Sequence, residues 1–246
     1  MRWTIILLGD RYTLKLLSER TSVDLFKVVQ VENEFLLESK EFENLASNND
    51  VDNIGQELIS FLNGLVFHKY NISSSIKSGG VMRFREDGKR DIFLKITETI
   101  KSSARLYEPT ITLKKIDGEI IVNKPGQHFL DKVGFAWNNL KARKIFRLMQ
   151  VGDLSFATIY KIVEILQSEK GSALYKWVSK NKIDLLMRTA NHNKAIGDEA
   201  RHGVSNVEPP KIPMKLEEAR SIVSILVDKF LAELNSEGLR PTSAPM

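Results

Sequence analysis

The chain lacks cysteine, and it holds only 7 prolines and 14 glycines among its 246 residues. The absence of cysteine excludes a disulfide scaffold, a thiolate zinc site and a cysteine nucleophile. With 42% hydrophobic residues, the composition also excludes a largely disordered chain. We therefore expect a globular protein, and the length allows one large domain or two small ones.

Long apolar runs are absent as well. The apolar run Ile5–Leu8 is too short for the core of a signal peptide, and Asp10 and Arg11 follow it closely. No stretch approaches the roughly 18 to 20 apolar residues that span a membrane. We therefore expect a cytoplasmic protein without a membrane partner.

Motifs for metal, phosphate or serine chemistry are missing too. The sequence contains no glycine-rich phosphate loop, no H-E-x-x-H zinc motif and no nucleophile elbow. The four histidines, at positions 68, 128, 192 and 202, do not have the spacing of metal ligands. We expect no metal and no cofactor.

Basic and acidic residues are distributed unequally between the two halves. Residues 1–122 hold 17 Lys and Arg against 18 Asp and Glu, whereas residues 123–246 hold 19 against 13. An excess of positive charge in the second half favours an anionic partner, of which RNA or DNA is the commonest. The alternative is a charge that serves solubility alone.

Residues 1–123 predict a small α+β domain, with an antiparallel sheet and one or two helices. Helical spacing of apolar residues predicts a helix over residues 48–67, behind a capping Asn/Asp cluster. Glu32-Asn33 is expected to join two strands, Asp87-Gly88 and Asp117-Gly118 predict hairpins, and residues 91–107 are ambiguous between strand and helix. The predicted strands lie at residues 3–10, 25–31, 34–37, 79–87 and 111–122.

Residues 124–246 predict a helical domain. Pro125-Gly126 lies in the stretch 122–127, which predicts the domain boundary. A proline-rich segment, residues 208–214, predicts an extended loop before the last helix. Apolar periodicity predicts four helices, at about residues 128–150, 154–169, 179 onward and 216–235. Asp153 is the expected N-cap of the second.

The third of these helices carries the candidate catalytic residues, in the stretch RTANHNKAIGDEARHG at 188–203. Arginines can hold a phosphate in a bidentate manner, and a histidine can act as acid or base near neutral pH. Asparagine and aspartate would orient these groups, and Glu164, one turn from Tyr160, would orient Arg188 or His202. The candidate set is His202, Arg188, Arg201, Asn191 and Asp198.

A straight helix would separate the ends of this set by about 21 Å, at about 1.5 Å per residue. Arg188 and His202 could then not act on one atom. A break at Gly197 that folds the second part back, or a two-fold interface between two copies, would remove the obstacle. The structural alternative is that these groups form ordinary helix pairs and caps.

The first predicted helix of this domain carries a second candidate surface. No acid occurs between Lys132 and Arg147. Such unneutralised charge suits a groove that follows a nucleic-acid backbone, although a solvated helix face would look the same. The candidate nucleic-acid-binding residues are Lys141, Arg143, Lys144 and Arg147.

The helical half resembles HEPN-like domains at the C-termini of bacterial proteins. The segments TIYKIVEIL, WVSKNKIDLLMRTANHNKAIGDEARHG and PPKIPMKLEEARSIVSIL carry the resemblance, which covers about residues 125–236. It implies a four-helix bundle that pairs as a homodimer. Many such domains are metal-independent ribonucleases of toxin and antiviral systems, with an arginine followed closely by a histidine. Neither Arg188–His192 nor Arg188–His202 has the family's spacing.

Two functional hypotheses follow. In the first, the protein is a HEPN-like effector that binds RNA or cleaves it without a metal, as a homodimer, in antiphage defence or a toxin system. In the second, the helical domain is a non-catalytic dimerisation or interaction module. In either case the domain at residues 1–123 would serve as a sensor or bind a protein partner.

Overall fold

The computed structural model describes residues 2–21, 25–71, 73–94, 111–114, 120–123, 133–201 and 208–238. The chain divides into two compact units, Met1–Gly134 and Phe135–Met246. Its mixed α+β class is as predicted, with an antiparallel sheet in the first unit and most helices in the second. Residues 124–127 of the predicted boundary lie outside the described residues.

The first unit is built on a five-stranded antiparallel sheet with the strand order β2-β3-β1-β4-β5. Two predicted hairpin turns are confirmed: Glu32 adopts a φ of 52°, and Gly88 adopts a φ of 79° between β4 and β5. The strands are β1 (Arg2–Leu8), β2 (Phe26–Val31), β3 (Glu34–Ser39), β4 (Lys77–Phe84) and β5 (Arg90–Leu94).

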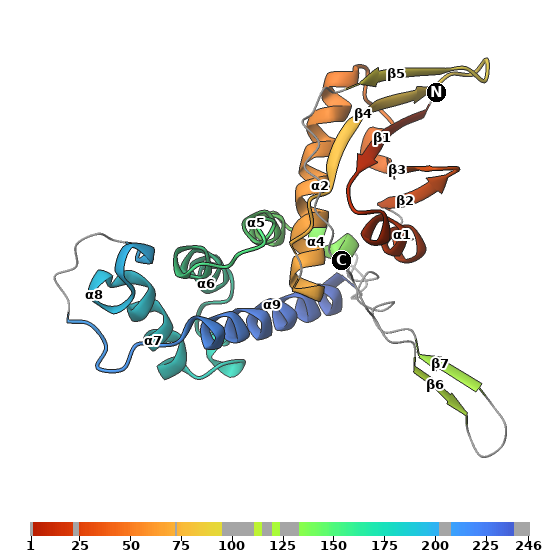
Figure 1. The fold of residues 1–246 in the computed structure, drawn as a ribbon. Helices are drawn as coiled ribbons and strands as arrows, with labels where there is room; N and C mark the ends of the chain where they lie inside the picture. The colour runs from red at the N-terminus through yellow and green to blue at the C-terminus, as the bar shows by residue number, and fades with distance from the viewer. Residues whose placement is uncertain are drawn as a thin grey trace, which may run out of the picture. The chain divides into compact units, whose positions relative to one another are not determined.

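Two helices accompany this sheet (Figure 1). The predicted helix is α2 (Asn48–Tyr70), which contacts β1 and β4. Gly55 permits this close contact, since a Cβ there would lie 2.7 Å from Cδ1 of Ile5. The second helix, α1 (Arg11–Arg20), was not predicted; Asp10 caps it by accepting the amide of Thr13 at 2.9 Å.

A separate antiparallel pair joins β6 (Ile111–Lys114) to β7 (Ile120–Asn123). It falls in the stretch predicted as strand, residues 111–122, and extends one residue beyond it. The Asp117-Gly118 turn predicted for it lies outside the described residues, as do residues 95–107 of the ambiguous segment.

The second unit is helical and is organised around α6 (Phe156–Lys170), which contacts three other helices. These are α5 (Leu140–Met149), α7 (Lys180–Asn191) and α9 (Leu216–Gly238). Apolar side chains of all four are buried between them, including Phe146, Ile159, Leu186 and Phe230. Two short helices, α4 (Val133–Asn138) and α8 (Asn193–Ile196), complete the described helices of this unit.

Three details of the helical prediction are corrected. The first predicted helix is interrupted at Asn139, whose extended backbone lets its side chain accept the amides of Lys141 and Ala142 at 2.9 and 3.0 Å. Ser155, rather than Asp153, caps α6. The third predicted helix ends at Asn191 instead of continuing toward residue 202. Among the described helices, none is both long and apolar enough to cross a membrane.

Candidate functional site

The polar stretch at residues 188–203 is not one helix. His192 ends α7 with an extended backbone, at φ −110° and ψ 112°, and begins α8. Its Nδ1 accepts the amide of Lys194 at 3.1 Å, and only 3% of the residue is exposed. The prediction of a single helix that carries Arg188, Asn191 and Asp198 is therefore wrong, because the buried His192 interrupts it.

A second break occurs at Gly197, as one of the two predicted routes requires. Gly197 adopts φ 65° and ψ −140°, a backbone conformation that residues other than glycine rarely adopt. The chain then turns back, and the amide of Arg201 donates to the carbonyl of Ala190 at 2.9 Å. This return places the backbone of Arg201 beside the last turn of α7, next to the position of Asn191.

The side chain of Arg201 lies on α6. Its guanidinium carbon stands 4.3 Å from the centre of the Tyr160 ring. Its Nη2 lies 3.9 Å from Oε1 of Glu164, one turn further along the same helix. Among the described residues, Glu164 therefore pairs with Arg201 rather than with Arg188, while its other predicted partner, His202, lies outside the described residues. The contact of Arg201 with the face of the Tyr160 ring was not predicted. The sequence signal for it was an aromatic residue and a carboxylate one turn apart on the same helix, Tyr160 and Glu164.

The remaining candidate catalytic residues are placed differently. Arg188 is exposed, and its Nη2 donates to the carbonyl of Glu208 at 3.4 Å. Asp198 is exposed in a 3₁₀ turn, Gly197–Glu199, and among the described residues Arg201 pairs with Glu164 rather than with Asp198. His202, the proposed acid or base, lies outside the described residues.

Asn191 carries a buried side-chain oxygen, Oδ1, that accepts no hydrogen bond in the described part of the chain. Most buried polar atoms in folded proteins have a partner, so each exception calls for an explanation. Because Asn191 directly follows Ala190, which binds the returning Arg201, the unsatisfied oxygen lies close to the turn that carries the candidate site.

The candidate nucleic-acid-binding residues lie on α5, whose opposite face is buried through Ala142, Ile145, Phe146 and Met149. Lys144 and Arg147 are exposed, and no acidic side chain among the described residues pairs with them. The other two are engaged by the protein: Lys141 Nζ donates to Ser168 Oγ at 3.3 Å, and Arg143 lies 4.9 Å above the ring of Trp137. The structure therefore divides the predicted basic set into two exposed and two tethered cations.

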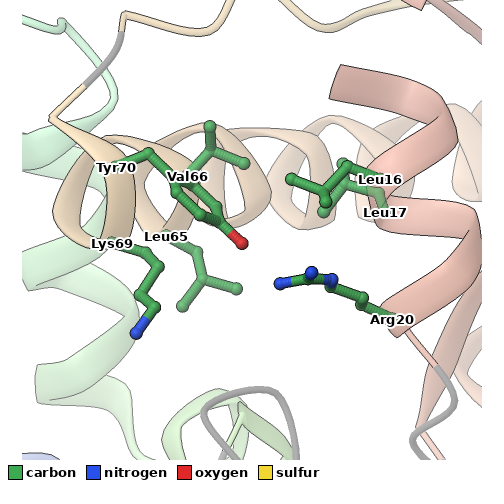
Figure 2. A pocket seen from close by; sticks show the side chains of 7 residues that line it. All are labelled: Leu16, Leu17, Arg20, Leu65, Val66, Lys69 and Tyr70. Atoms are coloured by element: carbon green, nitrogen blue, oxygen red, sulfur yellow. The ribbon is translucent and has the colours of Figure 1, made fainter. Parts of the chain in front are cut away.

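A small cleft lies between α1 and α2 in the first unit (Figure 2). Leucine and valine side chains line it together with Arg20, Lys69 and Tyr70. Its volume of about 240 Å³, which includes space open to solvent, is below the ~300–1,000 Å³ typical of small-molecule sites. We therefore do not assign a ligand to it.

No group of three or more histidine, aspartate or glutamate side chains suited to a metal ion occurs within the described ranges. Comparisons of the chain with protein-family models, with curated proteins and with solved structures find no match. The case for function therefore depends on the residues and geometry described above.

Proposed function

We propose that the protein binds RNA through its second unit, and that this unit is a HEPN-like four-helix bundle formed by α5, α6, α7 and α9. The observation that carries the proposal is a pair of exposed cations on α5, Lys144 and Arg147, which no acidic side chain within the described ranges neutralises. Two such side chains, one turn apart, can contact successive phosphates of a nucleic-acid backbone. The excess of basic residues in this half supplies a favourable long-range field.

We further propose that the unit cleaves RNA without a metal. In this mechanism His202 acts as acid or base on the attacking 2′-hydroxyl or the leaving oxygen, and Arg201 stabilises the charge on the phosphate. The return of the chain at Gly197 supports the role of Arg201, because it removes the separation that a straight helix would impose. Asn191 and Asp198 remain orienting candidates, and Arg188 a further phosphate ligand.

The cellular role follows from this activity. A homodimeric ribonuclease of this kind would act in antiphage defence or as a toxin in the bacterial cytoplasm. The first unit would then detect a trigger or bind a regulatory protein. Light scattering of the purified chain tests the dimer directly, and a monomer at micromolar concentration would remove that part of the proposal.

The binding test compares two variants with equal loss of charge. Lys144→Gln/Arg147→Gln removes the exposed α5 cations, whereas Lys211→Gln/Lys229→Gln removes two exposed lysines elsewhere in the unit. For single-stranded RNA, two lost phosphate contacts should lower the slope of log K against log salt by about 1.4. Equal effects of both double variants would show that α5 is not the binding surface.

The cleavage test measures degradation of mixed RNA in the presence of EDTA. We expect cleavage by the native protein and its loss in His202→Ala and Arg201→Ala, with RNA binding through α5 retained. Persistence of full cleavage in His202→Ala would exclude the proposed chemistry.

A non-catalytic module is the second candidate, and one observation favours it. Both candidate arginines already contact protein groups, Arg201 on Tyr160 and Glu164 and Arg188 on the Glu208 carbonyl. In that case the helical unit dimerises or binds a protein, and neither RNA binding nor cleavage depends on these residues. Absence of both RNA activities in the native protein would support this candidate.

A further inference from the structure

The contacts of Arg201 differ in how firmly they hold its guanidinium. Tyr160 lies under the group, with 4.3 Å from the guanidinium carbon to the ring centre. An aromatic ring attracts the cation through its face, which leaves the N–H groups at the guanidinium edge able to donate. Tyr160 can therefore position Arg201 and still leave it competent to bind an anion.

The contact with Glu164 is looser. The shortest distance is 3.9 Å, beyond the ~2.7–2.9 Å of a charge-assisted hydrogen bond. The side chains of Arg201 and Glu164 are 33% and 53% exposed, so solvent screens their attraction. A competing oxyanion that makes two direct hydrogen bonds to the same guanidinium would bind it better than this carboxylate does.

The backbone of Arg201 is fixed independently of both side chains. Its amide donates to the Ala190 carbonyl at 2.9 Å, which anchors the residue to the end of α7. Loss of the Glu164 contact would therefore leave the guanidinium in place above Tyr160. The arrangement thus combines an anchored Arg201 backbone, an aromatic ring that positions the guanidinium, and a carboxylate that an incoming anion can replace.

We propose that Arg201, Tyr160 and Glu164 form a phosphate-binding site in which an incoming phosphate displaces Glu164 from the guanidinium. Tyr160 is a positioning residue, and Glu164 sets the affinity by competing with the ligand. The assignment of this phosphate to RNA rests on the proposed function, whereas the exchange of carboxylate for phosphate does not. The site lies apart from the α5 cations in sequence and binds a single phosphate group.

The test uses the full chain and the NMR signal of the Arg201 Nε–H group, assigned by its disappearance in Arg201→Lys. Inorganic phosphate and then a short single-stranded RNA are titrated. We expect both to shift this signal. We also expect Glu164→Gln to bind phosphate roughly twofold to fivefold more tightly, which is the change in affinity that corresponds to the free energy of an exposed ion pair.

Glu169→Gln is the matched control, because Glu169 is another exposed carboxylate of α6. It removes the same charge and should change the affinity less than Glu164→Gln. Tyr160→Phe retains the ring and should bind phosphate as the native protein does, whereas Tyr160→Leu should bind it more weakly. Unfolding midpoints of all variants show that they are folded.

The outcomes separate this inference from the proposed function. A signal that responds to phosphate but not to RNA would sustain the exchange site and overturn RNA as its ligand. RNA binding that requires Lys144 and Arg147 while the Arg201 signal stays unchanged would sustain the RNA interface and overturn the exchange site. Equal effects of Glu164→Gln and Glu169→Gln would also overturn it, because the gain would then come from net charge alone.

Discussion

Gly197→Ala tests whether the reversal of the chain at this residue holds Arg201 in place. Gly197 has φ 65° and ψ −140°, and a Cβ added there would meet no atom within 4 Å. The substitution therefore introduces backbone strain without a steric clash. Such strain costs on the order of 1–3 kcal/mol, and the lower entropy of the unfolded alanine chain offsets about 0.4–1 kcal/mol of it.

The net destabilisation of the turn is thus about 1–2 kcal/mol, and its most direct effect falls on the amide of Arg201. That amide donates to Ala190 only while the turn is closed. Because 1.4 kcal/mol is a factor of ten in an equilibrium constant, local opening should become about five to thirty times more frequent. Hydrogen exchange of the Arg201 amide, followed by NMR, measures this factor.

Gly171→Ala provides the matched control. Gly171 has nearly the same backbone conformation, at φ 54° and ψ −131°, and equal space for a Cβ, but it ends α6. Both substitutions should lower the free energy of unfolding by a similar amount. Only Gly197→Ala should accelerate exchange at Arg201 beyond the change in global stability, and equal acceleration by the two would refute the reasoning.

Three further predictions concern stability, each read from the urea midpoint. Thr189→Val should cost about 1–3 kcal/mol, because the buried Oγ1 accepts the Met214 amide at 3.1 Å and valine leaves that donor unsatisfied; Thr189→Ser, which keeps the hydroxyl, should recover part of the loss. Gly55→Ala should cost about 1–3 kcal/mol by overpacking, because the new Cβ would lie 2.7 Å from Cδ1 of the buried Ile5. An unchanged midpoint would mean that α2 can move away from β1 without loss of stability. Asn139→Ala should cost about 1 kcal/mol through loss of the α5 cap, whereas Asn139→Asp should retain the cap and stability.

The sequence predicted strands β1 to β4 of the first unit, because each of them combines an apolar run with a turn signal, whereas it left the segment of β5 ambiguous between strand and helix. Glu32-Asn33 and Asp87-Gly88 mark their hairpins locally, and no distant contact is needed to recognise them. The helix α1 was missed because its buried face is short, consisting of Thr13, Leu14 and Leu17. Its cap at Asp10 was visible in the sequence but stood directly after the turn that ended the strand.

The helices of the second unit were predicted from their periodicity, but their interruptions were not. Asn139 lies inside a continuous helical pattern, and its capping role appears only when its backbone becomes extended. His192 interrupts a second pattern in the same way, since a buried histidine that accepts an amide replaces a helical hydrogen bond. The spacing of apolar residues indicates which side chains face the core. A single extended residue between two helices hardly changes that spacing, so the interruption is not visible in it.

The candidate site shows the same division between local and distant information. The sequence singled out the arginines, Asn191 and Glu164 as candidates, and it offered a break at Gly197 as one of two routes, from the poor helix propensity of glycine. The ion pair between Glu164 and Arg201 was not predicted, because it depends on where the chain goes after Gly197. That direction is fixed by one long-range hydrogen bond, from Arg201 to Ala190, which has no signature in the sequence.

The two functional hypotheses differ physically in what Arg201 does when its ion pair is removed. If Arg201 is a structural strut between the returning chain and α6, then Glu164→Gln lowers stability and leaves anion binding unchanged. If it is a phosphate ligand, the same substitution costs little, because the pair is loose and exposed, and anion binding rises. A single variant therefore moves two measurable quantities in different ways, and the 3.9 Å separation and the independent backbone anchor both favour the second result.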